Sequence, residues 1–147
     1  MEQTTHEPDR VRAHTSEEAN NRIDQAIRNS IHAYAGQSKA AMSRRIEELD
    51  REWDIERTLE LNASTLALTG LFLGVTVNKR WLIVPGVVLP FLFQHAVQGW
   101  CPPLPVLRSM GIRTREEIDC EKYALKALRG DFEDVRDPNA ALEAAEF

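Results

Sequence analysis

The feature that most constrains this chain is a stretch from residue 61 to 114 that contains no Asp or Glu. Two uncharged runs lie within it, 61–78 and 81–107, separated only by Lys79 and Arg80. A helix needs roughly 20 mostly apolar residues to cross the ~30 Å hydrocarbon core of a bilayer. The second run exceeds this length and the first is close to it. The alternative is a buried helical pair in a soluble protein, which 147 residues could hardly cover on every side. The runs therefore predict two membrane-spanning helices.

Charge is confined to the two flanks of this stretch. Residues 1–60 carry 13 acids and 9 bases, residues 115–147 carry 10 and 5, and the stretch itself carries four bases. The net charge of −5 lacks the basic surplus usual in nucleic-acid-binding proteins, so no nucleic-acid partner is expected.

The predicted fold class is all-α. We expect a two-helix transmembrane hairpin with a long N-terminal amphipathic helix and a C-terminal cytoplasmic or interfacial helix. The predicted segments are a disordered N-terminus at 1–14, an amphipathic cytoplasmic helix at 15–58 with a break near Gly36, a transmembrane hairpin at 59–107 with spans at about 60–78 and 81–101, an amphipathic helix at 114–130, and an acidic disordered tail at 131–147.

Two apolar stripes mark the N-terminal helix. They consist of Ile23, Ile27, Ile31 and Tyr34, and then of Met42, Ile46, Leu49 and Trp53. The spacing of the second stripe fits a short coiled-coil seam, which would make this a self-association helix. The alternative is an amphipathic helix lying on the membrane surface or on another part of the chain.

Small residues form one stripe on the first span, namely Ala63, Ala67, Gly70 and Gly74. Lipid tails are as apolar as leucine, so helices associate in membranes where small side chains let backbones approach. The stripe is predicted to pack against the second span. A homodimer interface is the alternative.

Trp81 and Trp100 are the predicted interface anchors of the second span. Tryptophan favours both interfaces of a bilayer, and the separation of the two residues corresponds to roughly 28 Å of helix at about 1.5 Å per residue. The proline-rich segment 101–105 that follows is expected to end the helix. The chain is then predicted to run along the surface, where Arg108, Arg113 and Arg115 suit lipid head groups.

The predicted helix at 114–130 carries one basic face beside an apolar one. Bases and apolar side chains in this arrangement are typical of a helix at a membrane interface. Packing against the N-terminal helix is the alternative.

Gln94, His95 and Gln98 form a predicted intramembrane polar cluster. Polar groups at such a depth are functional or bonded to a neighbouring helix. The favoured interpretation is a hydrogen bond between helices, to Asn62, Ser64 or Thr65. The alternative is a substrate or ion pathway. His95 and Cys101 have no third ligand at a metal-site spacing, so no metal or cofactor is expected.

Orientation follows from the flanking bases. Nine lie close to the outer ends of the spans and two in the turn, which predicts that both termini are cytoplasmic. The nine are Arg44, Arg45, Arg51, Arg57, Arg108, Arg113, Arg115, Lys122 and Lys126.

The segment 99–114 resembles a motif of the small two-span bacterial inner-membrane family that includes the membrane domain of YgaP-type rhodanese proteins. The matching residues are Gly99, Trp100, Cys101, Pro102, Leu107, Gly111, Ile112 and Thr114. The resemblance covers about residues 59–115 and implies a helical hairpin able to dimerise, with a largely undefined biochemical role. Rhodanese activity in that family belongs to a separate domain with its own cysteine loop, so no sulfurtransferase activity is implied here.

These observations predict a multi-pass protein of the bacterial inner membrane without enzymatic activity, acting as a structural or interaction module. Its expected partners are the lipid bilayer and a cytoplasmic protein, with a homo-oligomer as a further expectation. The first alternative is a small oligomeric channel or transporter for an anion or a sulfur species. The second, a membrane-bound thiol enzyme, depends on Cys101 alone.

Overall fold

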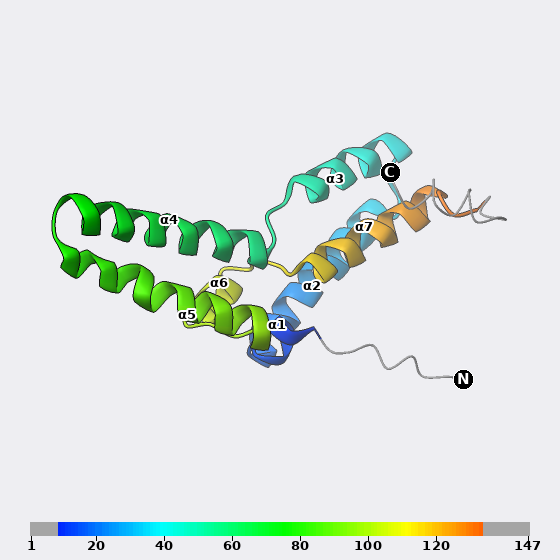
Figure 1. The fold of residues 1–147 in the computed structure, drawn as a ribbon. Coiled ribbons are helices and arrows are strands. Elements are labelled where there is room, and N and C mark those ends of the chain that lie inside the picture. The colour runs from blue at the N-terminus through cyan, green and yellow to red at the C-terminus, as the bar shows by residue number, and fades with distance from the viewer. Residues whose placement is uncertain (1–8, 134–147) are drawn as a thin grey trace. The chain divides into compact units, whose positions relative to one another are not determined.

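The computed structural model describes residues 9–133, and over these residues the fold is all-helical. The helices belong to two compact units (Figure 1). Unit 1 contains residues 9–22 and 53–114, and unit 2 contains residues 23–52 and 115–133. Each unit therefore combines an early and a late part of the chain.

Unit 1 is organised around two long helices, α4 (Ile55–Thr76) and α5 (Ile83–Gln98), which lie side by side and run in opposite directions (Figure 1). The Asp54 side chain caps the start of α4 by accepting a hydrogen bond from the Arg57 amide at 2.8 Å. Such a cap satisfies one of the free amides of the first turn. The 3-10 helix η1 (Lys79–Leu82) joins the pair.

The two long helices expose their apolar side chains. Two helical segments, ending at Thr76 and Gln98, are long and apolar enough to cross a membrane, judged by length and composition. Only 17% and 6% of their most apolar windows are buried within the protein, whereas the core helix of a soluble protein would be mostly buried. Phe72 and Phe93 are 67% and 72% exposed. The described part of the chain therefore leaves most of these two apolar surfaces uncovered.

Three shorter elements complete unit 1. They are α1 (Arg10–Ala13), the first residues of α2 (Glu17–Tyr34) and α6 (Leu104–Ser109). The chain after the prolines was predicted to run along the surface. This prediction was wrong in one respect, because the prolines lead directly into the short helix α6. Proline fits the first turn of a helix, where its missing amide hydrogen has no partner to lose.

Unit 2 packs α3 (Lys39–Arg51) and the rest of α2 with α7 (Arg115–Arg129). Its core contains Ile46, Leu49, Ile118 and Leu125, with Tyr34 packed against them. Glu121 is only 1% exposed and accepts hydrogen bonds from Ser30 and, at 3.0 Å, from Arg45. The apolar faces of these amphipathic helices are thus covered within the chain.

This packing corrects the interfacial prediction for 114–130. The apolar face of α7 lies against α3, which corresponds to the alternative interpretation of this helix. Its bases also have partners inside the unit, since Lys122 contacts Asp50 and Arg129 donates to Ser43 and Asp131. The apolar stripe of α3 is likewise buried within unit 2. It is therefore not exposed for coiled-coil pairing with another chain.

Several predicted boundaries differ from the structure. Residues 10–13 form α1, although disorder was predicted for 1–14, and residues 1–8 lie outside the described part. The segment 15–58 divides into α2, α3 and the start of α4, with one of its breaks at the predicted position near Gly36. Of the predicted acidic tail at 131–147, only 131–133 is described.

Trp53 does not continue the stripe of α3. It lies beyond the end of that helix, is 45% exposed, and has the Arg57 guanidinium 4.3 Å from its ring centroid.

Candidate functional site

The predicted polar cluster is only partly assembled on α5. The Gln94 amide donates to the Gln98 side chain at 3.3 Å along the same helix, and Gln98 is exposed. His95 is buried, with 8% of its surface exposed. These three residues occupy the end of α5 that is remote from the turn at η1.

The predicted hydrogen bond from this cluster to α4 does not form. Asn62 donates instead to the Thr58 carbonyl of its own helix at 2.8 Å. His95 Nδ1 is buried and lacks a hydrogen-bond partner among the described residues. A buried imidazole nitrogen without a partner carries a desolvation cost, so this atom is the least satisfied group of the segment.

A pocket lies between α4, α5 and the segment leading into α6, and His95 is part of its wall. Its volume is about 380 Å³. The lining comprises Leu59, Asn62, Ala63, Leu66, Val88, Phe91, Leu92, His95, Cys101, Pro102, Pro103 and Leu107. The wall is thus apolar with three neutral polar groups: an imidazole, an amide and a thiol.

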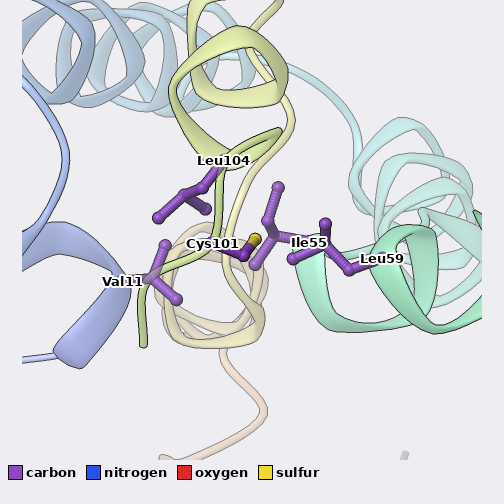
Figure 2. Close-up of a cluster of buried hydrophobic side chains, with 5 residues drawn as sticks. All are labelled: Val11, Ile55, Leu59, Cys101 and Leu104. Carbon is purple, nitrogen blue, oxygen red and sulfur yellow. The ribbon is translucent and has the colours of Figure 1, made fainter. Parts of the chain in front are cut away.

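Cys101 belongs both to the pocket wall and to a small hydrophobic core. Figure 2 shows its sulfur among Val11, Ile55, Leu59 and Leu104, and Cys101 is 3% exposed. These five buried residues are called the exit cluster. Trp100, Leu107 and Ile112 pack against it. Most residues that carry the family resemblance therefore have a structural role in unit 1.

Gly99 ends α5 in a left-handed conformation with φ of 74°. A β-carbon at this position would lie 2.6 Å from the Arg10 β-carbon, so only glycine allows α1 to approach. The Arg10 guanidinium donates to the Ala96 carbonyl at 2.8 Å. A cation at this position satisfies carbonyls that a helix end leaves free and interacts favourably with the helix dipole.

Arg108 is completely buried, which corrects its predicted contact with lipid head groups. It donates to the Thr15 hydroxyl at 3.2 Å, the Ile112 carbonyl at 3.0 Å and the Asn20 side chain at 2.9 Å. Arg113 is also buried, and its carbonyl accepts the first amide of α4, that of Ile55, at 2.9 Å. These arginines organise the polar end of unit 1.

The glycines of the small-residue stripe lie at the contact between α4 and the following segment. A β-carbon on Gly70 would approach Pro85 Cδ to 2.6 Å, and one on Gly74 would approach Leu82 Cδ2 to 2.5 Å. Ala63 lines the pocket, and Ala67 is partly buried. The two glycines thus permit close contact inside one chain, the use that the sequence favoured over a homodimer interface.

The two predicted anchors have different surroundings. Trp81 is 45% exposed on η1, whereas Trp100 is partly buried against the exit cluster. In residues 9–133, no group of three or more His, Cys, Asp or Glu side chains could hold a metal ion.

Sequence analysis did not identify the pocket, the Arg10 contact or the buried Arg108. Arg10 and Ala96 are 86 positions apart, and no local pattern connects them. The one available clue was an arginine near a helix end, which is equally typical of an exposed residue.

Comparison with protein-family models, with curated proteins and with solved structures gave no match.

Proposed function

We propose that this chain is an integral protein of the bacterial inner membrane, anchored by α4 and α5 as a two-span hairpin and acting as a structural or interaction module without enzymatic activity. The observation that carries the proposal is the exposure of apolar side chains along both helices. In water such a surface would favour aggregation, whereas in lipid it would be solvated by acyl chains.

The distribution of polar groups in unit 1 supports the same proposal. Arg10 and Arg108 lie at the end where α5 finishes and α6 begins, and both donate to protein oxygens. The middle parts of α4 and α5 contain no charged residue. Backbone groups in hydrocarbon must be satisfied internally, and two helices meet this requirement.

The proposed topology places both termini in the cytoplasm. Three of the nine flanking bases, Arg108, Arg113 and Lys126, are buried. The remaining six still outnumber Lys79 and Arg80 of the turn, so the flanking bases still favour cytoplasmic termini.

Alkaline carbonate extraction of membranes tests insertion. We expect the full chain to stay in the pellet and to dissolve only with detergent. Recovery of a monodisperse chain in the carbonate supernatant would overturn the membrane proposal.

Thiol labelling of intact cells tests topology. Lys79→Cys is introduced with Cys101→Ser and Cys120→Ser, and a membrane-impermeant maleimide should label this turn position from outside. The matched variant carries the single native Cys120, which is exposed on α7 and should react only after the membrane is opened. The reverse pattern would contradict the topology and leave insertion intact.

Unit 2 supports the interaction part of the proposal. Its core is buried within the chain, while charged side chains such as Glu48 and Asp50 remain exposed. The family resemblance stays a proposal that depends on residues 99–114. No observation in the described residues favours the channel alternative, since Gln94 bonds to Gln98 along one helix.

A further inference from the structure

We propose that the pocket between α4, α5 and the start of α6 binds an uncharged, membrane-soluble molecule with an apolar body and one carbonyl or hydroxyl oxygen that hydrogen-bonds to His95. This inference deepens the proposed function and rests on it, because such a ligand would enter from the bilayer. Three features point to such a ligand: the size of the pocket, the chemistry of its wall, and the unsatisfied nitrogen of His95.

The size and shape fit a small molecule. The volume of about 380 Å³ lies within the roughly 300–1,000 Å³ usual for such sites. The walls come from three different segments, and the exit cluster supports one of them through Cys101. Residues on rigid helices hold such a wall better than a loop would.

The wall indicates that the ligand is uncharged. None of the described residues that line the pocket is Lys, Arg, Asp or Glu. Arg10, at the C-terminal end of α5, donates to the α5 carbonyls of Ala96 and Val97. A carboxylate or phosphate placed here would lose its hydration without gaining a countercharge.

His95 indicates that the ligand has a polar atom. This side chain is more than nine-tenths buried, and its Nδ1 has no hydrogen-bond partner within residues 9–133. Burying a polar group costs free energy unless it is hydrogen-bonded. A neutral imidazole can donate to a ligand carbonyl or exchange a hydrogen bond with a hydroxyl. Phe91 provides an aromatic side chain in the same wall, against which a flat ring can pack.

Two kinds of membrane molecule share this chemistry: lipid-soluble quinones and acylglycerols. The binding experiment uses the full chain in detergent micelles with Trp53→Phe and Trp81→Phe, so that only Trp100, beside the exit cluster, reports. The probe is a fully substituted benzoquinone with a medium-length alkyl tail, which cannot add to Cys101 and quenches tryptophan fluorescence. We expect a saturable component corresponding to one site per chain, above the collisional quenching of free quinone.

Competitors identify the ligand class. A monoacylglycerol that displaces the quinone indicates a general site for carbonyl or hydroxyl amphiphiles, and failure to displace it indicates a quinone site. Both results support the proposal. An alkylbenzene of similar size, which lacks oxygen, should not compete. Equal competition by this hydrocarbon, or no saturable component at all, would overturn the proposal.

Variants locate the site. His95→Phe keeps an aromatic ring but removes the hydrogen bond and should weaken quinone binding about tenfold, or ~1.4 kcal/mol. His95→Asn retains a donor and should recover part of the affinity, which also guards against a fold defect in His95→Phe. Gln98→Leu changes a neighbouring polar residue outside the lining and should bind like the parent. Unchanged affinity in both His95 variants would refute the role of this side chain.

The two proposals can fail separately. A chain that resists carbonate extraction but shows no saturable quenching would refute the ligand and leave the membrane anchor. A chain recovered in the carbonate supernatant would refute the anchor whatever the quenching result.

Discussion

Unit 1 and unit 2 are both helical, but they distribute apolar side chains in opposite ways. In unit 2, Leu49, Ile118 and Leu125 are fully buried in a core. In unit 1, the long helices expose Phe72, Val75 and Phe93. One unit has the arrangement of a protein folded in water, and the other suits a lipid environment.

The comparison indicates that helicity alone does not identify the environment of a segment. The helices α3 and α7 are amphipathic, and their apolar faces pack against each other. The helices α4 and α5 have no amphipathic division, and α4 closely approaches α5 at Gly70. The two pairs of helices differ in whether their apolar side chains are buried within the chain or exposed on its surface.

The largest expected effect is a core truncation in unit 2. Leu49→Ala should destabilise α3 and α7 by about 2–5 kcal/mol, because it leaves a cavity in a packed core. Native-state hydrogen exchange of amides in these two helices measures the loss. Leu68→Ala removes the same atoms from a side chain that is 66% exposed on α4, and it should leave exchange in unit 2 unchanged. Equal losses from both substitutions would abolish the distinction between the units.

The second effect is the insertion of charge on the outward face of α4. Leu68→Arg should disfavour membrane insertion by roughly 2.5–3.5 kcal/mol, the cost of a central arginine on insertion scales. Leu128→Arg places the same charge on a half-exposed position of α7 and should change insertion and stability by less than about 0.5 kcal/mol. The inserted fraction in carbonate-washed membranes measures both. A normal inserted fraction for Leu68→Arg would contradict lipid contact at this position.

The third effect tests the glycine contact. Gly70→Ala should weaken packing between α4 and α5 by about 1–3 kcal/mol, because the added carbon overlaps Pro85 and Val84. Gly86→Ala is the control, since nothing lies within 4 Å of a β-carbon added there. Thermal unfolding in detergent, followed by circular dichroism, compares them. Similar melting temperatures for the two variants would exclude a close contact at Gly70.

The smallest effect concerns pH and unit 2. The hydrogen bond from Arg129 lowers the pKa of Asp131 below its ordinary value of 3.8. The folded state therefore keeps this carboxylate charged, and its contribution is complete above the unfolded pKa and is lost as the pH falls through the folded one. We expect about 1 kcal/mol or less, as is usual for a partly exposed pair.

Hydrogen exchange of α7 amides between pH 6 and pH 3, after correction for intrinsic exchange rates, measures this loss. Asp131→Asn and Arg129→Gln should each flatten the same part of the profile. An unaltered profile in both variants would assign the acid sensitivity to other groups of unit 2.

The sequence predicted the helical segments well where composition was one-sided. The uncharged runs anticipated α4 and α5 because a long segment of mostly apolar residues favours a long helix. The amphipathic helix predicted at 114–130 likewise corresponds to α7. Prediction failed where the partner was distant in the chain. Arg108 was expected at the surface because nothing nearby indicates that Thr15 and Asn20 would receive its hydrogen bonds.

The candidate site shows the same limit. Its polar residue His95 was identified from the sequence, but the predicted hydrogen bond to α4 is absent. Asn62 donates to its own helix, and His95 Nδ1, in the wall of an apolar pocket, has no partner among the described residues. Whether a polar side chain is bonded depends on distances between helices, which spacing along one helix does not define.

The amino-acid sequence alone determined that this chain is helical, that it has two long uncharged segments, and that charge is kept to the flanks. These properties follow from the composition and from local conformational preferences, which act residue by residue. Only the tertiary structure decided that α7 packs against α3, that Gly99 allows Arg10 to approach the end of α5, and that a pocket forms beside His95. These features require contacts between distant parts of the chain, whose geometry emerges only when whole helices pack.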